Sequence, residues 1–334
     1  CGSTMFIALK SAGVQPGDAV LTNCFTLAPV PGAIAHAGGR AVLVDVADDY
    51  TIDLADLERK AGSSGARVLL LSHMRGHICD MDRLSSICRA HGITLIEDCA
   101  HTMGAGWNGR ATGTWGKAGC FSLQSYKHAN AGEGGLLVTD DADISAQAIL
   151  YSGSYMFYTA HAARPGDGAF ERWKHLIPNL SLRMGNLPAA LALPQLGAVL
   201  RDRCKRWNQR YEWLAEALVG TPHLTVPARV PREQFVASSL QFSLTGLSGA
   251  VIARFLDSCA ERGVFIKWFG AEAAKGFTSV STHWGYLHEP QSLPNAPRVL
   301  AGLCDMRLPL TLTQADCLTI AEVIQDAMGR ATSG

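Results

Sequence analysis

The segment from residue 93 to residue 141 reads ITLIEDCAHTMGAGWNGRATGTWGKAGCFSLQSYKHANAGEGGLLVTDD. It contains three short apolar runs that have the length and composition of buried strands: Thr94–Asp98, Gly119–Leu123 and Gly135–Thr139. Asp98 ends the first run, and Lys127 follows the second. Because open α/β sheets place their sites at the carboxyl ends of strands, this segment predicts both a sheet and the location of a site.

The chain before this segment alternates strands and helices. Three further strand-like runs are Ala19–Asn23, Arg40–Val46 and Arg67–Ser72. Stretches with apolar residues at helical spacing follow them: Leu27–Ala37, Leu54–Ala61 and Met81–Ala90. The strand-like runs are apolar throughout and do not alternate apolar with polar residues, and helices separate them. This pattern predicts an α/β fold with a mostly parallel sheet flanked by helices.

The second half of the chain predicts a smaller α/β unit. A long amphipathic stretch, Leu187–Val219, is expected to bridge to it. The elements expected after that stretch are a strand Leu240–Leu244, a helix Val251–Arg262, a strand Val264–Trp268 and a helix Thr313–Met328 that opens with a Thr313/Asp316 capping box. We therefore expect a large domain over residues 1–200 and a small domain over residues 201–334. The long irregular segment Tyr151–Pro178 is expected to have a function.

Composition excludes several classes of protein. The 334 residues contain 29 Lys+Arg and 29 Asp+Glu, so the chain lacks the positive charge of a typical nucleic-acid binder. Only 17% of residues are charged and 48% are hydrophobic, which indicates a folded chain with a large core. No apolar run reaches membrane-spanning length, so no membrane partner is expected. The ten cysteines form no C-x-x-C pair, which predicts free thiols in a cytoplasmic protein.

Three local patterns resemble sites of a different kind. The glycines at 104, 106 and 109 match the dinucleotide fingerprint, but a turn-rich segment follows them, so we expect a glycine-rich turn. His73 and His77 have the spacing of a metal pair, yet they flank Gly76 and no third ligand follows, so we expect loop histidines and no metal. Thiol catalysis by Cys99 or Cys120 is the third alternative, and burial is the commoner fate of such residues.

Asp98, Ser122 and Lys127 together match the needs of one cofactor. Pyridoxal 5′-phosphate (PLP) requires a lysine amine, an acid at its pyridine nitrogen and donors for its phosphate. A lysine that is desolvated beyond a strand has a lowered pKa, and its amine can then form a Schiff base with a carbonyl. Taken alone, the lysine and the acid also have interpretations without a cofactor, because lysines are usually solvated surface groups and acids often end strands.

Seven segments occur in the order of one known family: CGSTMF (residues 1–6), GVQPGDAVLTNCFTLAP (13–29), LSHMRGHICDMD (71–82), IEDCAH (96–101), FSLQSYKHANAGEGG (121–135), RMGNLPAALALPQL (183–196) and RLPLTLT (307–313). Over nearly the whole chain the sequence resembles the DegT/DnrJ/StrS family of PLP-dependent sugar aminotransferases, which have the aspartate-aminotransferase fold type I. Several motifs in one order are more specific than any single motif.

The resemblance implies roles for the matching residues. Lys127 would hold the cofactor as a Schiff base and shuttle protons, Asp98 would bind the pyridine nitrogen, and His101 would lie beside the ring. The phosphate would be met by a helix N-terminus and by hydroxyl groups, from Gly2, Ser3, Thr4 and Ser122.

Two positions depart from the family pattern. In this family a loop of the neighbouring subunit completes the site through an N-Y-R-M segment, which implies a homodimer with shared sites. Here Arg183 is retained, but Ser181 replaces the asparagine and Asn179 is a second candidate for that contact. The aromatic residue that commonly stacks on the cofactor is replaced by Leu27.

The resemblance implies transfer of an amino group from glutamate or glutamine to a keto-sugar or related keto acceptor, with pyridoxamine 5′-phosphate (PMP) as the intermediate. One alternative is a sugar dehydratase of the same family, which typically carries His at the lysine position, whereas His128 is one residue out of register. Another alternative is a non-catalytic PLP-binding sensor. The segment Lys267–Tyr286 is expected to shape the acceptor pocket, where Lys267 and Lys275 are candidate phosphate contacts.

Family members usually have a few dozen residues before the phosphate-binding helix, whereas this sequence starts at Cys1. We therefore expect an N-terminal segment to precede Cys1.

Overall fold

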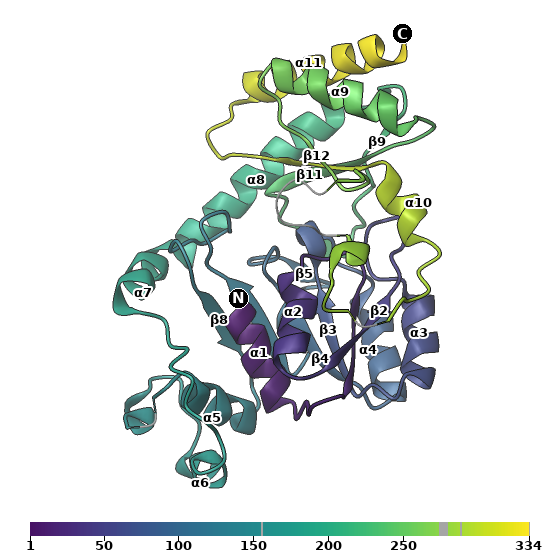
Figure 1. Cartoon of the computed structure of the whole chain (residues 1–334). Helices are drawn as coiled ribbons and strands as arrows, with labels where there is room; N and C mark the ends of the chain where they lie inside the picture. The colour runs from purple at the N-terminus through teal and green to yellow at the C-terminus, as the bar shows by residue number, and fades with distance from the viewer. Residues whose placement is uncertain (155, 274–279, 288, 334) are drawn as a thin grey trace.

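The predicted sheet has six strands, in the order β2-β1-β3-β4-β7-β8 (Figure 1). Their bounds are Ala19–Asn23 (β1), Arg40–Val44 (β2), Val68–Ser72 (β3), Thr94–Asp98 (β4), Ala118–Ser122 (β7) and Gly135–Val138 (β8). All neighbouring pairs are parallel except the edge pair β7–β8, which is antiparallel. This computed structural model describes residues 1–154, 156–273, 280–287 and 289–333. The mostly parallel α/β class expected from the sequence is confirmed.

Helices cover both faces of this sheet. On one face, α1 (Gly2–Ser11) packs against β4, β7 and β8, and α2 (Pro29–His36) packs against β1 and β2. On the other face lie α3 (Leu54–Ser63) and α4 (Met81–Ala90). Because side chains alternate along a strand, Val20 belongs to the core under α1 and α2, whereas Leu21 belongs to the core under α3 and α4.

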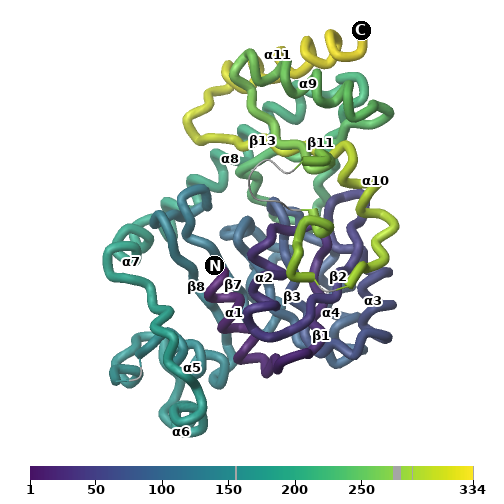
Figure 2. Tube along the Cα trace, viewed as in Figure 1, coloured from purple at the N-terminus to yellow at the C-terminus, as the bar shows by residue number. Residues whose placement is uncertain are grey.

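A second, antiparallel sheet lies at one end of the first (Figures 1 and 2). Its strand order is β12-β13-β11-β9, with bounds Lys267–Trp268 (β12), Leu303–Arg307 (β13), Ser239–Leu244 (β11) and Leu224–Thr225 (β9). Three helices pack together beside it: α8 (Ala198–Ala217), α9 (Gly249–Glu261) and α11 (Gln314–Thr332). The predicted capping box of α11 is present, since Thr313 and Asp316 exchange hydrogen bonds.

The prediction of one continuous helix over Leu187–Val219 is wrong. The stretch is divided into α7 (Asn186–Ala192), a short 3-10 turn (Leu193–Gln195) and α8. Pro194 lies in the turn and Gly197 has φ +70°, a combination that ends one helix before the next begins. The domain boundary predicted between residues 200 and 201 falls within α8 and stays a prediction.

Other differences are local. The strand expected over Val264–Trp268 is paired only at β12, and β13 was not expected as a strand. The segment Tyr151–Pro178 is less irregular than expected, because it contains α6 (Asp167–Trp173), which buries Phe170 against α5 (Ala142–Tyr151). Across the described ranges, no helix combines the length and apolar character needed to cross a membrane.

Candidate active site

Three parallel strands end side by side at one edge of the main sheet. Their last residues are Asn23 in β1, Ser72 in β3 and Asp98 in β4, and all three are buried. The Asn23 side-chain amide donates to the Ser72 carbonyl at 3.0 Å, and its Oδ1 accepts from the Ser72 amide at 2.8 Å. This exchange joins the ends of β1 and β3, and the pairing of β3 with β4 places Ser72 opposite Asp98.

The Asp98 carboxylate is held by a chain of buried hydroxyls. Thr26 Oγ1 donates to Ser72 Oγ at 2.8 Å, and Ser72 Oγ donates to Asp98 Oδ2 at 2.9 Å. The Ala100 amide donates to Asp98 Oδ1 at 3.1 Å. Hydrogen bonds of this kind stabilise an ionised carboxylate and fix its orientation. The sequence pattern identified Asp98 but missed Thr26 and Ser72 as its supports.

The amine of Lys127 lies 2.7 Å from Nε2 of His101. Lys127 is in the turn after β7, and His101 is in the turn after β4, so the parallel strands bring them together. Burial and the charge of Lys127 hold the pKa of His101 well below its usual range. The imidazole is therefore neutral, and it accepts a hydrogen bond from the lysine when the amine is protonated.

Lys127 has the electrostatics of a reactive amine. Burial lowers its pKa to about 8, Asp98 opposes that shift, and the charges of Arg75 and Arg307 add to it. A lysine with this pKa has an appreciable unprotonated fraction near neutral pH, and only the unprotonated amine attacks a carbonyl. The predicted pair of Lys127 and Asp98 is therefore electrostatically coupled, although it comes from two different strands.

The neighbouring His128 has a different environment. Its Nδ1 is 2.9 Å from the Met103 carbonyl and its Nε2 is 3.2 Å from Ser238 Oγ. Burial lowers its pKa to about 4, so the ring is neutral. His128 links the turn after β7 to the second sheet and does not occupy the position of Lys127.

Helix α1 begins close to β7 and β8 and has no side-chain cap. Gly2 and Ser3 are exposed at its first turn, whereas Thr4 is buried and its hydroxyl donates to the Cys1 carbonyl at 2.6 Å. Uncapped amide groups and the helix dipole favour an anion at this end. Gly2 and Ser3 line a cavity of about 650 Å³ together with Leu180 and Leu182.

The other predicted cofactor contacts lie at varied positions. Ser122 is buried at the end of β7, and its Oγ accepts from the Gln124 amide at 3.3 Å. Leu27 is half-buried before α2. Ser181 has φ +52° and its amide donates to Asn179 Oδ1, and Arg183 is exposed. Within the described part of one chain, no hydrogen bond or ion pair joins Ser181 or Arg183 to Lys127.

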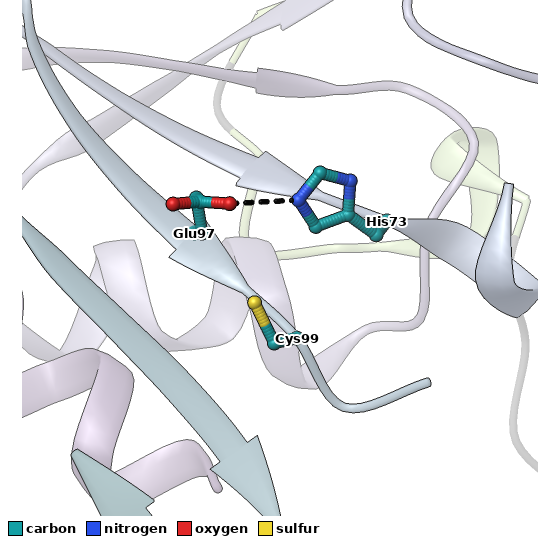
Figure 3. A group of neighbouring side chains, drawn as sticks. All are labelled: His73, Glu97 and Cys99. Atoms are coloured by element: carbon teal, nitrogen blue, oxygen red, sulfur yellow. Dashed lines mark hydrogen bonds and ion pairs between the residues drawn. The ribbon is translucent and has the colours of Figure 1, made fainter. Parts of the chain in front are cut away.

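A second buried cluster contains His73, Glu97 and Cys99, whose ligand atoms lie within 4.8 Å of one another (Figure 3). Both oxygens of Glu97 already accept hydrogen bonds, from His73 Nε2 at 3.1 Å and from the amides of Gly113, Trp115 and Gly116. The cluster therefore serves as a structural link between β3, β4 and the loop 113–116.

The structure also decides among the remaining alternatives from the sequence. His77 is buried and bonds Gln241 rather than pairing with His73. Burial raises the pKa of the Cys99 thiol well above its usual range and that of Cys120 to about 12, so neither is a reactive thiol. The three glycines form a turn around the short pair β5 (Gly106–Trp107) and β6 (Arg110–Ala111), as expected. Lys275 lies outside the described residues.

A lysine and an acid at the carboxyl edge of a mostly parallel, helix-covered sheet, with a smaller sheet beside them, define the class of fold type I α/β proteins. The chain belongs to the DegT/DnrJ/EryC1/StrS aminotransferase family, whose sequence model matches residues 1–325.

Individual relatives agree with this assignment. The chain is 31% identical over 226 residues to the spore coat polysaccharide biosynthesis protein SpsC of Bacillus subtilis, a match that covers 66% of this chain and 57% of that protein. It is 41% identical over 147 residues to the L-glutamine:scyllo-inosose aminotransferase of Streptomyces griseus, covering 44% of this chain and 34% of that protein. The chain thus spans less than two thirds of the length of such curated relatives.

Solved structures share the fold. The crystal structure of 3-amino-5-hydroxybenzoic acid synthase matches with a TM-score of 0.83 and 24% identity, over 98% of this chain and 85% of that one. Spr1654 from Streptococcus pneumoniae matches in its PLP form with a TM-score of 0.83 and 18% identity, over 99% of this chain and 86% of that one, and it also matches in a PMP form.

Proposed function

We propose that this protein is a PLP-dependent aminotransferase that moves an amino group from glutamate or glutamine to a keto-sugar or keto-cyclitol. The observation that carries the proposal is the lysine amine with a pKa of about 8, which lies 2.7 Å from a neutral His101. The family assignment supports the reaction class, and relatives named for sugar-polymer and scyllo-inosose chemistry support the acceptor class.

The residues present fit the cofactor. Asp98 is a buried carboxylate held by Ser72 and the Ala100 amide, which suits it to hold a proton on a pyridine nitrogen. The uncapped start of α1 offers amide groups of Gly2 and Ser3 to a phosphate, and Ser122 adds a hydroxyl. PLP would contribute an electron-withdrawing ring that makes the carbon next to the transferred nitrogen acidic.

Side chains of the protein would hold the cofactor and move the protons. Lys127 would hold the cofactor through its Nζ atom. When Nζ is free and unprotonated, it would accept a proton from the carbon next to the transferred nitrogen and return it. The neutral His101 is hydrogen-bonded to that amine and so keeps it in position. Asp98 raises the pKa of Lys127 while Arg75 and Arg307 lower it, which keeps the amine near the pH at which it both takes up and releases protons.

The two alternatives have less support. A dehydratase of this family would carry a histidine where Lys127 stands, and His128 is bonded to Met103 and Ser238 instead. A sensor that only binds the cofactor would not need an amine with a lowered pKa.

We propose a homodimer in the cytoplasm. Large apolar side chains on and after α7 are strongly exposed, namely Leu187 (72%), Leu191 (51%) and Leu193 (73%), and a second copy would cover them. In such a dimer Ser181 and Arg183 would reach the site of the other copy. The described cysteines are all free, which fits a reducing compartment.

The test is a transamination assay on purified protein that has been reconstituted with PLP. The protein is incubated with glutamate or glutamine and a panel of keto-sugars and keto-cyclitols, and mass spectrometry measures the keto acid and the aminated product. Borohydride reduction followed by peptide mapping should locate the cofactor on Lys127. A Lys117→Ala variant, which removes an exposed lysine, serves as the control. Attachment elsewhere, or no amino transfer to any acceptor, would contradict the proposal.

A further inference from the structure

Three cationic side chains lie near the Lys127 site, and the reaction described above gives none of them a contact with a substrate. Arg75 lies in the turn after β3, and Lys267 and Arg307 belong to neighbouring strands of the second sheet, β12 and β13. Their charges interact with the site and with one another. Arg75 and Arg307 lower the pKa of Lys127 and of His101, and the same two arginines lower the pKa of Lys267.

Arg75 is held by an ion pair with Asp305, which belongs to a buried hydrogen-bond network. Its Nη2 lies 2.9 Å from Oδ2 of Asp305, and both side chains are buried, with 9% and 3% of their surface exposed. Asp305 Oδ1 accepts from Gln241 Nε2, and Gln241 Oε1 is 2.9 Å from Nε2 of His77. Arg75 Nε is buried and has no hydrogen-bond partner among the described residues. The guanidinium is therefore fixed but only partly satisfied.

Aromatic rings, not acids, hold the other two cations. The Arg307 guanidinium lies 4.3 Å from the ring centroid of Tyr126, the residue before Lys127. The Lys267 amine lies 4.7 Å from the centroid of Phe269, whose ring packs edge-on against Phe25 at 5.1 Å. Within the described ranges, neither Lys267 nor Arg307 forms an ion pair with a carboxylate. Cation–π contacts position a charge without neutralising it.

The group therefore has three positive charges and one negative charge, that of Asp305. An excess of charge in a partly buried place is unfavourable unless a counter-charge arrives. Arginine and lysine together favour oxyanions, because the guanidinium makes paired hydrogen bonds and the ammonium acts as a point charge.

We propose that Arg75, Lys267 and Arg307 form an anion subsite beside Lys127 that binds the carboxylate or phosphate group of a substrate. The inference rests on the proposed function, since it assigns part of a substrate to a place in that site. It is separate from the phosphate contact proposed at the start of α1. A carboxylate would identify the amino donor as the ligand, and a phosphate would identify the acceptor.

The experiment measures binding without turnover. The reconstituted holoprotein is titrated with succinate and, separately, with inorganic pyrophosphate, by calorimetry at constant ionic strength. Arg307→Gln and Lys267→Gln should each weaken binding of the preferred probe by about tenfold or more, because each removes a charge-assisted contact. Arg262→Gln is the matched control, since Arg262 is exposed and paired with Asp326 far along the chain.

Each outcome decides the proposal. Preferred binding of succinate assigns the subsite to the amino donor, and preferred binding of pyrophosphate assigns it to the acceptor. Failure of both probes to bind, or equal binding by the wild type and the Arg307 and Lys267 variants, overturns the subsite. Loss of bound PLP from these variants also overturns it, because the cluster would then serve the cofactor. If Arg307-dependent binding is found in a protein that shows no transamination, the proposed function fails while the subsite stands.

Discussion

The amine of Lys127 and Nε2 of His101 are 2.7 Å apart, and because the imidazole is neutral, a protonated lysine amine donates this hydrogen bond. The two residues follow different strands, β7 and β4, and meet because those strands are parallel neighbours. Asp98 raises the pKa of Lys127, whereas Arg75 and Arg307 lower it. Substitution of one of these charged residues should therefore shift the pKa of Lys127 in a known direction.

The reactivity of Lys127 should change near pH 8. Burial lowers its pKa to about 8, whereas an ordinary lysine has a pKa of about 10.4. In the cofactor-free protein, labelling of Lys127 by an amine reagent, followed by mass spectrometry, should rise with a midpoint near that pH. Arg307→Gln should raise the midpoint, because it removes a positive charge that disfavours the protonated amine. Arg262→Gln should leave it unchanged, and a wild-type midpoint near that of an ordinary lysine would refute the assignment.

Lys127→Ala should abolish both covalent attachment of PLP and turnover. The variant lacks the amine that binds the cofactor and moves the proton, and loss of such a group typically lowers rates by about 10³-fold or more. Absorbance spectroscopy and the transamination assay check the two effects. Lys117→Ala should behave as the wild type. Persistent multiple-turnover transamination by Lys127→Ala would exclude the role given to this residue.

Ser72→Ala should impair the site without unfolding the protein. The hydroxyl donates to Asp98 at 2.9 Å and accepts from Thr26, so its loss leaves the carboxylate less well oriented. A charge-assisted hydrogen bond contributes about 1.5–3 kcal/mol, so we expect roughly a tenfold or larger fall in kcat/KM. Ser63→Ala, which alters an exposed helical serine, is the control. Unchanged kcat/KM in Ser72→Ala would show that Asp98 does not depend on this support.

Glu97→Gln should destabilise the fold. Glu97 accepts from His73 and from three backbone amides, and replacement of one oxygen by an amide group places a donor against donors. We expect a loss of about 2–5 kcal/mol in the free energy of unfolding, measured by urea denaturation. The exposed Glu58→Gln is the control.

The Glu97 effect should also depend on pH. Burial raises the pKa of Glu97, but the hydrogen bonds from His73, Gly113 and Gly116 outweigh burial, and the folded-state pKa is below the usual value. A depressed carboxyl pKa contributes stability above the unfolded-state pKa of about 4.3 and loses that contribution as the pH falls below it. The difference between wild type and Glu97→Gln should therefore shrink in acid, and a constant difference would argue against an ionised Glu97.

Complementation tests the proposed sharing of sites. Lys127→Ala is expected to be inactive. Arg183→Ala is also expected to be inactive if Arg183 reaches the site of a second copy. When equal amounts are unfolded together and refolded, about half of the dimers are mixed and each mixed dimer has one intact site, so about a quarter of wild-type activity should return. Activity that stays near zero after mixing would place both residues in the same copy's site or rule out exchange.

The strand ends show what could be predicted from the sequence. Asp98 and Lys127 could be predicted as candidate site residues because an acid and a lysine just beyond apolar runs are typical of a site at the carboxyl edge of an α/β sheet. Thr26 and Ser72 were missed, because a serine or threonine after a strand is common and only the hydrogen bonds to Asp98 distinguish these two. Arg75 was missed because its partner Asp305 is far away along the chain and β13 was not predicted.

The α/β class and a candidate site with a lysine and an acid could be predicted from the sequence, since burial periodicity and residue type are local properties. The helix before α8 was mispredicted, because Pro194 and Gly197 interrupt it. The length of β12 was mispredicted, because its pairing with β13 decides where it ends. The electrostatics of the site could not be predicted in the same way. The pKa of Lys127 depends on burial and on Asp98, Arg75 and Arg307, and charges act through space regardless of their distance along the chain.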